Sequence, residues 1–332
     1  MAYETPESVL ELARNFMECR ILLTGAELDL FTLLAPAPLS AEELSRKVST
    51  DPRRLTAVLD ALAAMGIITK KEGKYRCPES VAKWLSEDSP ATILPMILHT
   101  VHLWRRWSDL TDVVKGTKTP GAAVAHAPPQ GELTAFIGAM HVIASKLAPR
   151  VAAAVAPGSA KALLDIGGGS GVYTAAFLRA APEMKATLFD RPPVIEMARE
   201  RLKEAGVLHR VTLVPGDFYK DEFPTGHDLA LISAIIHQNS LEQNVGLYAK
   251  AFRALLPGGR LIIRDHVMSP DRTSPKPGAV FALNMLVGTA GGGTYTLDEI
   301  RAGLRQAGFA DVRLIQEGQQ MDALVEAVKP RG

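Results

Sequence analysis

The feature that most constrains the fold of this chain is an apolar segment that ends in a glycine-rich turn. Residues 164–171 read Leu-Asp-Ile-Gly-Gly-Gly-Ser-Gly, and a helix is predicted over 172–181. Glycine tolerates positive φ and carries no Cβ, so Gly167 and Gly169 let a ligand approach the main chain closely. The turn also directs a helix N-terminus at that ligand. We therefore expect a strand–turn–helix unit that binds a nucleotide-like molecule.

The spacing of the glycines separates two classes of ligand. A dinucleotide-binding loop has the pattern G-x-G-x-x-G, which would place a glycine where this chain has Val172. Gly171 instead comes one residue early. The tighter turn suits an adenosyl group with a short charged tail, as in S-adenosylmethionine (SAM), because no pyrophosphate has to be cradled.

Two further segments complete a candidate cofactor site. An apolar run ends in Asp190, about 20 residues after the loop, where an acid can accept hydrogen bonds from both ribose hydroxyls. A later run leads into Asp217 and Phe218. There the carboxylate could bind the adenine amino group while the aromatic ring packs on the purine. A glycine loop alone is a weak signal, but the three features in this order favour a SAM site.

From residue 161 onward, strand and helix patterns alternate. Strands are predicted at 162–166, 185–189, 211–214, 228–233, 260–265, 311–316 and 322–328, and the helices between them include 194–205, 241–254 and 297–307. Repeated strand–helix units predict an α/β fold with a mostly parallel sheet that is covered on both faces. Ligands bind at the carboxyl ends of such strands, which is where the residues named above are expected.

These motifs resemble those of class I SAM-dependent methyltransferases, and the whole chain is similar to the small-molecule O-methyltransferases of the caffeic acid and hydroxyindole type. The matching stretches are 164–171, 189–192, 216–218, 235–237 and 256–260. The resemblance implies a Rossmann-like catalytic domain with a mostly parallel seven-stranded sheet over 157–332. It also implies a mainly helical winged-helix dimerisation domain over 1–90 and a helical linker over 91–156 that contributes to the substrate pocket.

The N-terminal segment is typical of a winged helix. Apolar residues at helical spacing over 6–34 predict two helices that pack through Val9, Leu12 and Phe16, among others. Ser40 begins a capping-box pattern at the start of the next helix. Further helices are predicted at 41–48 and 53–65, and wing strands at 67–69 and 74–76. This order of helix, turn, helix and wing defines the module.

A winged helix can bind DNA, or it can pair with a second copy. Only Arg53, Arg54 and Thr56 could reach DNA from the second helix, and the rest of that helix is largely apolar. The formal net charge of +1 gives no overall field that attracts nucleic acid or anionic lipid. In the resembled family the module forms a homodimer and helps to close the partner's substrate pocket. We expect a homodimer here, with neither a nucleic-acid nor a membrane partner.

The candidate base is His237, which follows the fourth predicted strand. A phenol of pKa about 10 is a poor nucleophile at neutral pH, so an imidazole of pKa about 6.5 is a useful base. In the resembled family the matching histidine is the catalytic base, and an acid matching Asp265 flanks it. A second family acid is replaced by Thr294, and the acid that usually follows the histidine is absent because Gln238 and Asn239 follow. These departures leave open a more acidic hydroxyl or a carbon nucleophile as the acceptor.

Other site residues are assigned by position. Ser233 matches the family position near the sugar or adenine of the cofactor. Substrate contacts are expected from the segment before the glycine loop and from the segment that usually forms the substrate lid. These residues are Trp104, Met140, His141, Asn284 and Met285. We expect the acceptor to be a small aromatic or polyketide-like molecule.

Cysteine usage and the termini bear on the compartment. Two cysteines are too few for a disulfide framework, which fits a reducing cytoplasm. No basic cluster precedes an apolar core near the N-terminus, so no secretory signal is predicted. The apolar stretch 91–103 is too short to span a bilayer and contains Pro95. We expect a cytoplasmic protein.

Three alternatives stay open at this point. The same fold and cofactor could serve methyl transfer to carbon or nitrogen. Two imidazoles and a carboxylate from His237, Asp265 and His266 could bind iron or zinc, although we expect no metal. The chain could also be a SAM-binding regulator whose winged helix binds DNA.

Overall fold

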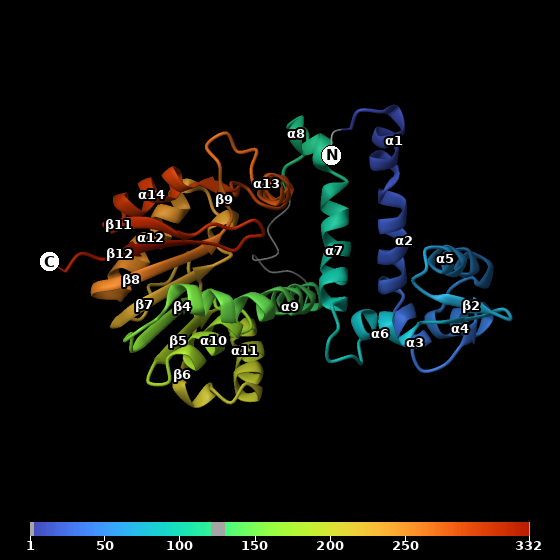
Figure 1. Ribbon diagram of the computed structural model, residues 1–332, viewed down its shortest axis with the longest axis horizontal. Coiled ribbons are helices and arrows are strands. Elements are labelled where there is room, and N and C mark those ends of the chain that lie inside the picture. Colours follow the sequence, from blue (N-terminus) through green and yellow to red (C-terminus); the bar gives the residue numbers. More distant parts are fainter. Residues whose placement is uncertain (1–2, 121–129, 332) are drawn as a thin grey trace. The chain divides into compact units, whose positions relative to one another are not determined.

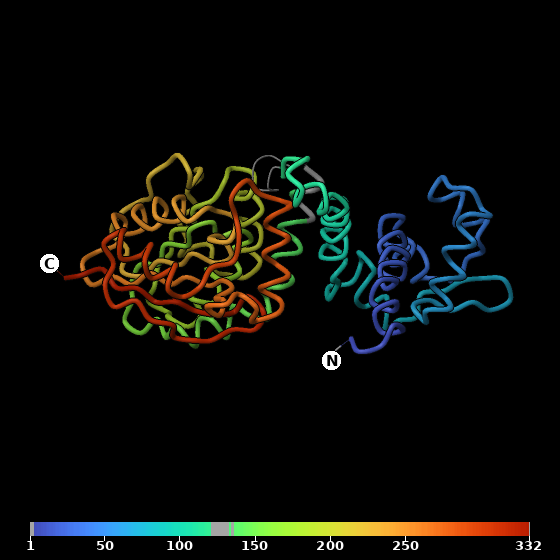
Figure 2. The backbone as a smooth tube through the Cα atoms, turned by 90° about the horizontal axis from the view of Figure 1, so that it is seen from above, coloured from blue at the N-terminus to red at the C-terminus, as the bar shows by residue number. Residues whose placement is uncertain are grey.

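The structure is a computed structural model that describes residues 3–120 and 130–331. The chain divides into two compact units, Met1–Trp104 and Arg105–Gly332. Helix α7 (Leu94–Trp107) contains the point of division. Figures 1 and 2 show the two units, coloured from blue at the N-terminus to red at the C-terminus. In the described residues, no helix combines the length and the apolar character needed to cross a lipid bilayer.

The N-terminal unit is mainly helical, with a small sheet. Its elements are α1 (Pro6–Arg14), α2 (Phe16–Glu27), α3 (Leu30–Leu34), β1 (Leu39–Ser40), α4 (Ala41–Val48), α5 (Pro52–Ala64), β2 (Thr69–Lys71), β3 (Lys74–Arg76) and α6 (Glu79–Leu85). The Ser40 hydroxyl accepts from the backbone N–H of Glu43, whose side chain accepts from the Ser40 N–H, as the capping pattern predicts. In the described residues the wing is a three-stranded sheet rather than a hairpin, because Leu39 of β1 pairs with Tyr75 of β3.

The first helices of this unit differ from the prediction. The described part of segment 6–34 forms three helices rather than two, and α1 buries no residue. Val9, Leu12 and Phe16 are 50, 52 and 51% exposed, so the prediction that they pack within the chain is wrong. The core of the unit is filled instead by side chains from α3, α4 and α5. The apolar stripe of α1 is therefore left at the surface of the single chain.

The C-terminal unit alternates strands and helices. Its elements are α8 (Leu110–Val114), α9 (Gln130–Val155), β4 (Ala162–Ile166), α10 (Val172–Ala180), β5 (Lys185–Asp190), α11 (Pro192–Glu204), β6 (Val211–Pro215), β7 (His227–Ser233), α12 (Leu241–Ala254), β8 (Leu255–Asp265), β9 (Val267–Met268), α13 (Lys276–Gly288), β10 (Tyr295–Thr296), α14 (Leu297–Gln306), β11 (Ala310–Gln316) and β12 (Ala323–Val328). Two short 3₁₀ turns lie at Leu208–Arg210 and Ile236–Gln238.

The predicted α/β fold is confirmed. The described residues form a seven-stranded sheet in the order β11-β12-β8-β7-β4-β5-β6. Strands β4 to β8 run parallel, and β12 runs antiparallel to both of its neighbours. Strand β8 starts at Leu255, earlier than predicted. A register irregularity against β7, between the pairs His227–Leu255 and Leu229–Arg260, accommodates the residues before Arg260.

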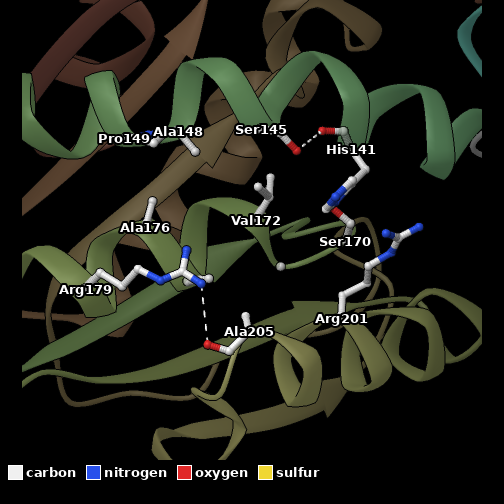
Figure 3. Close-up of a pocket in the computed structure, with 12 residues that line it drawn as sticks. His141, Ser145, Ala148, Pro149, Ser170, Val172, Ala176, Arg179, Arg201 and Ala205 are labelled. Atoms are coloured by element: carbon white, nitrogen blue, oxygen red, sulfur yellow. Dashed lines mark hydrogen bonds between the residues drawn. The ribbon is translucent and has the colours of Figure 1, made fainter. Parts of the chain in front are cut away.

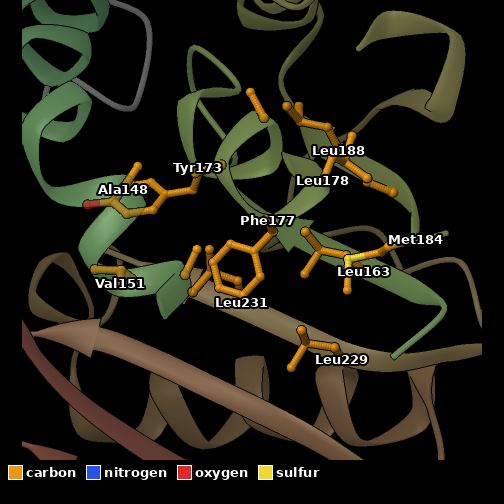
Figure 4. Packing of buried hydrophobic residues seen from close by; sticks show 14 of the residues in the cluster. Ala148, Val151, Leu163, Tyr173, Phe177, Leu178, Met184, Leu188, Leu229 and Leu231 are labelled. Carbon is orange, nitrogen blue, oxygen red and sulfur yellow. The ribbon is translucent and has the colours of Figure 1, made fainter. Parts of the chain in front are cut away.

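Helices cover both faces of this sheet (Figure 1). Successive strand residues point to opposite faces, so neighbours along a strand belong to different cores. Leu163 and Leu231 pack with residues of α9, α10 and α11, including Phe177, as Figure 4 shows. Leu164 and Ile232 pack on the other face with residues of α12 and α14. The strands are thus fixed from both sides, and their carboxyl ends form a rigid edge.

Candidate active site

The site residues lie along one edge of the sheet, where the parallel strands end. Register pairs Ile166 at the end of β4 with Phe189 of β5 and Ile232 of β7. Asp190 pairs with Pro215 at the end of β6, and Ser233 pairs with Arg264 of β8. The glycine loop, Asp190, Asp217 and the His237 segment therefore follow neighbouring strands and lie at the same edge of the sheet.

The glycine loop adopts backbone conformations that favour glycine. Gly167, Gly169 and Gly171 have φ of +67°, +55° and +76°. A Cβ on Gly167 would lie 2.7 Å from the Cδ1 atom of Ile235, whereas a Cβ on Gly169 would have nothing within 4 Å. The loop is therefore closed on the side of Gly167 and open at Gly169, and the open position offers bare backbone to a ligand.

Asp190 is held against this loop. Its Oδ2 accepts from the N–H of Gly169 at 2.8 Å, and its Oδ1 accepts from the N–H of Arg191 at 2.7 Å. Burial raises the pKa of Asp190, and these two hydrogen bonds oppose that rise. Each carboxylate oxygen keeps a further acceptor position, which suits a ribose hydroxyl. The side chain thus fits the role predicted for it.

A buried acid below the loop received no role in the sequence reasoning. Asp165 is 1% exposed and accepts a hydrogen bond of 2.6 Å from the Thr174 hydroxyl in α10. Burial raises its pKa to about 6, partly offset by Thr174. A Cβ on Gly168 would lie 3.1 Å from the Asp165 carboxyl carbon. Asp165 therefore packs beneath Gly168 of the loop, which gives a structural reason for an acid near the end of the strand.

The third element of the predicted cofactor site also lies next to the loop. The Cε1 atom of Phe218 is 3.7 Å from the position of a Cβ on Gly167. Asp217 accepts a hydrogen bond of 2.9 Å from the backbone N–H of Tyr219. Phe218 thus lies against the loop, and the roles of Asp217 and Phe218 in adenine binding stay predictions.

Ser233 lies at the end of β7, but its hydroxyl is engaged within the protein. Its Oγ accepts from the Nε of Arg264 at 2.7 Å. Arg264 is buried, also donates to the Met321 carbonyl at 2.6 Å, and stands over the ring of Tyr173 at 5.2 Å. The sequence reasoning missed this arginine, because an isolated cation inside a strand gives no signal of what it contacts. The role of Ser233 in cofactor binding stays a prediction.

His237 and Asp265 form a close pair. The Nδ1 atom of His237 lies 2.9 and 3.0 Å from the two carboxylate oxygens of Asp265. Burial would raise the pKa of Asp265, but the charge and hydrogen bond of His237 and the N–H of His266 outweigh burial and lower it. A carboxylate only accepts, so Nδ1 carries the proton that it donates. In the neutral imidazole, Nε2 is then free to take a proton.

Packing and backbone contacts fix the segment that carries His237. The ring of Phe281 in α13 meets the imidazole edge-on, with centroids 4.9 Å apart. The N–H of Gly293 donates to the His237 carbonyl at 2.8 Å. Ala234, at the start of the segment, has φ of +57°, and its N–H donates to the Arg264 carbonyl at 2.8 Å. His237 is thus held by contacts on several sides.

Of the acids that surround the matching histidine in the resembled family, this chain keeps Asp265. In the described part of the chain, Asp265 is the carboxylate that lies within hydrogen-bonding distance of His237. Thr294 is buried, and its carbonyl accepts from Arg272 at 2.7 Å. Within the described residues, buried His266 has no partner for its Nδ1, and burial lowers its pKa. Across residues 3–120 and 130–331, no three His, Cys, Asp or Glu side chains are placed to hold a metal ion.

The predicted substrate residues are spread over three places. Asn284 in α13 accepts a hydrogen bond of 3.0 Å from the indole of Trp107, and Met285 beside it is buried. Trp104 belongs to the N-terminal unit, where its ring lies 6.3 Å from that of Phe16. Met140 is partly buried in α9. Which of these residues contacts an acceptor stays a prediction.

His141 contacts the glycine loop. Its Nδ1 lies 3.1 Å from the hydroxyl of Ser170. The two side chains line a cavity of about 220 Å³ between α9, α10 and α11, together with Arg179 and Arg201 (Figure 3). Burial lowers the pKa of His141. The structure thus places His141 beside the start of α10, and its role in substrate binding stays a prediction.

Comparison with known proteins gives consistent matches. A family described as an O-methyltransferase domain matches residues 107–310, and one described as an O-methyltransferase dimerisation domain matches residues 10–88. The tetracenomycin polyketide synthesis 8-O-methyl transferase TcmO of Streptomyces glaucescens is 32% identical, over 98% of this chain and 97% of the relative. The 3-hydroxy-5-methyl-1-naphthoate 3-O-methyltransferase of Streptomyces sahachiroi is 28% identical, over 94% and 91%. The solved mitomycin 7-O-methyltransferase MmcR is 26% identical, covers 97% of each chain and has a TM-score of 0.83.

Proposed function

The chain belongs to the O-methyltransferase family and is a SAM-dependent O-methyltransferase, and on this premise we propose that it methylates a hydroxyl of a small aromatic or polyketide-like acceptor, with His237 as the general base. The observation that carries the proposal is the His237–Asp265 pair: His237 follows β7, the strand next to β4 and its glycine loop, and Asp265 ends β8 on the other side of β7. An imidazole held by a buried carboxylate at Nδ1 presents a basic Nε2 at the place where the cofactor is bound.

The described residues fit SAM. Gly169 offers open backbone, Asp190 has acceptor positions left for ribose hydroxyls, and Asp217 and Phe218 lie beside the loop for adenine. SAM, when bound, supplies an electrophilic methyl group. The acceptor hydroxyl would give its proton to Nε2 of His237 as the new bond to carbon forms. Asp265 would then stabilise the imidazolium that results.

The class of acceptor is proposed from the relatives and from the residues near His237. TcmO, the naphthoate enzyme and MmcR are each named for an O-methyl transfer. In this chain Phe281 stands against His237, and Met285 lies one turn further along α13. An apolar, aromatic surface beside the base suits a planar acceptor. We assign Asn284 and Met285 of α13 to the substrate pocket on the same grounds, while Met140, His141 and Trp104 stay candidates from the family resemblance alone.

We also propose which segment of the chain forms each domain. Residues 1–90 would form the dimerisation domain, 91–156 the helical linker and 157–332 the catalytic domain. The exposed apolar stripe of α1, which includes Val9 and Leu12, supports a homodimer because a second copy would cover it. The test is the mass in solution, and a strictly monomeric protein at micromolar concentration would contradict this part.

The function is tested by methyl transfer from labelled SAM. A panel of polyhydroxylated naphthalenes and anthraquinones should include methyl acceptors, whereas matched amines of the same ring systems should not react. Mass spectrometry detects the transferred methyl group, and its NMR chemical shift shows whether it is on oxygen. Labelled nitrogen or carbon products with no labelled oxygen would refute the proposal.

A further inference from the structure

Asn239 is buried, and both its side-chain amide and its backbone carbonyl form hydrogen bonds. It is 0% exposed. Its Oδ1 accepts from the hydroxyl of Tyr219 at 2.6 Å, and its Nδ2 donates to Oδ1 of Asn244 at 2.9 Å. Its backbone carbonyl accepts from the hydroxyl of Tyr295. A buried polar network that is satisfied in this way fixes its members in one arrangement.

The two ends of this network belong to different parts of the site. Tyr219 directly follows Asp217 and Phe218, the pair assigned to adenine, and its ring lies 4.6 Å from that of Phe218. Asn244 donates to the carbonyl of Ile236 at 2.9 Å, next to His237. One chain of hydrogen bonds therefore runs from the adenine end of the site to the segment that carries the base.

The direction of each hydrogen bond is fixed by chemistry. Burial, with the charge of Asp217, raises the pKa of Tyr219 to about 12, so its hydroxyl remains a donor at neutral pH. The Ile236 carbonyl can only accept, so Asn244 donates to it through Nδ2 and turns its Oδ1 to Asn239. Asn239 therefore donates to Asn244 through Nδ2 and accepts from the Tyr219 hydroxyl with Oδ1. An amide offers both an acceptor and a donor, whereas a carboxylate offers only acceptors.

We propose that Asn239 is a positioning residue which couples the adenine end of the SAM site to the His237 segment, so that a bound adenosine fixes the loop that carries the base. The inference rests on the proposed function, because it needs the site to accept an adenosyl ligand. When Phe218 packs on an adenine, Tyr219 loses freedom, and Asn239 passes that restriction to Asn244 and Ile236. Binding at one place then orders another without direct contact.

The first experiment measures hydrogen exchange rather than turnover. Amides in 236–244 are followed with and without S-adenosylhomocysteine (SAH), the demethylated form of SAM. In the wild type, SAH should slow their exchange at least about fivefold. Tyr219→Phe removes only the hydroxyl that donates to Asn239, so it should bind SAH within about threefold of the wild type by calorimetry yet lose most of the slowing. Equal slowing in the wild type and in Tyr219→Phe would overturn the coupling.

The second experiment is a double-mutant cycle on kcat. Tyr219→Phe and Asn239→Ala should each lower kcat about tenfold with little change in KM for SAM, and the double variant should be no worse than the worse single variant. Tyr75→Phe is the control, because it removes a buried hydroxyl that donates to Asp60 in the N-terminal unit. It should cost stability without changing kcat or the exchange of 236–244. Independent, additive effects of the two substitutions would refute the coupling.

The two proposals fail in different ways. SAH-dependent slowing in 236–244 together with no methyl transfer to any acceptor of the panel would support the coupling and refute the proposed acceptor class. Turnover of acceptor without any slowing in the wild type would do the reverse.

Discussion

Two neighbouring loops of the same sheet are built in opposite ways. The 167–171 loop after β4 is short of side chains, and at Gly169 its backbone is open. The 234–240 segment after β7 is filled with side-chain contacts from Phe281, Asn244 and Tyr295. In the proposed function, the first loop binds SAM with its main chain and the second presents the imidazole of His237. The first loop has few side-chain atoms near its open position, whereas several partners hold the second.

The largest expected effect tests the second loop. His237→Ala removes the proton acceptor and should lower kcat about 10²- to 10⁴-fold. Since His237 is not assigned to the adenosyl ligand, SAH affinity by calorimetry should stay within about threefold. His209→Ala, at an exposed histidine, is the matched control and should keep full activity. A His237→Ala protein with near-normal kcat would show that the segment is built for something other than proton transfer.

The next test replaces two glycines of similar φ in the 167–171 loop with alanine. Gly167→Ala should destabilise the free protein by about 3 kcal/mol, because its Cβ meets Ile235 in addition to the cost of positive φ. Gly169→Ala should cost about 1 kcal/mol of stability but weaken SAH binding at least tenfold, since its Cβ enters the open side. Urea unfolding and calorimetry measure the two quantities.

A compensating change sharpens this result. Ile235→Val removes the Cδ1 atom that a Cβ on Gly167 would meet. The double variant Gly167→Ala/Ile235→Val should therefore recover about 1 kcal/mol relative to Gly167→Ala alone. The same Ile235→Val change should not restore SAH binding to Gly169→Ala. Equal behaviour of the two glycine variants would remove the distinction between a closed and an open side.

The pH dependence of stability tests the floor of the glycine loop. The native state raises the pKa of Asp165 to about 6 from a usual 3.8, so the folded protein holds this proton more tightly. Stability from Asp165 is present at low pH and is lost as pH rises through 6, by about 1.4 kcal/mol between pH 5 and pH 8. Asp165→Asn should lack this slope.

The buried histidines do not obscure that test. Burial lowers the pKa of His227 and His266, which gives the opposite slope in both proteins. The difference between wild type and Asp165→Asn in urea unfolding therefore isolates Asp165. A difference that does not change between pH 5 and pH 8 would mean that the carboxyl titrates normally under the loop.

The smallest expected effect concerns the packing of the base. Phe281→Leu keeps an apolar side chain but removes the edge-on ring contact with His237. Such a contact contributes about 0.5–1.5 kcal/mol, so kcat should fall about two- to tenfold with KM for SAM unchanged. Rescue of kcat by Phe281→Tyr would tie the effect to the ring. A loss of SAH affinity instead of kcat would move Phe281 from the base to the cofactor site.

Local patterns predicted the parts of the molecule that repeat. The alternation of strands and helices gave the sheet, because each element there is long enough to show its period. The two-residue strands β1, β9 and β10 carry no period and were not predicted. The stripe on α1 has a clear period, which predicted packing within the chain, but the structure leaves it exposed. A periodic apolar stripe predicts that a helix face packs against something, but it does not identify the partner surface.

The site shows the same limit at the level of single residues. His237 and Asp265 were predicted as a pair by resemblance, and the structure brings them together. Tyr219 and Asn239 are 20 positions apart and carry no shared motif, so their hydrogen bond could not be read from the chain. Directed contacts between remote residues arise only when the strand ends meet.

Ala234 has a left-handed backbone, so replacing it with glycine would change both the stability of the protein and the segment that carries His237. A methyl group at this φ costs the folded chain about 1–2 kcal/mol relative to glycine. Ala234→Gly would therefore make the protein harder to melt. The same change would widen the range of backbone conformations open to the start of the segment that carries His237.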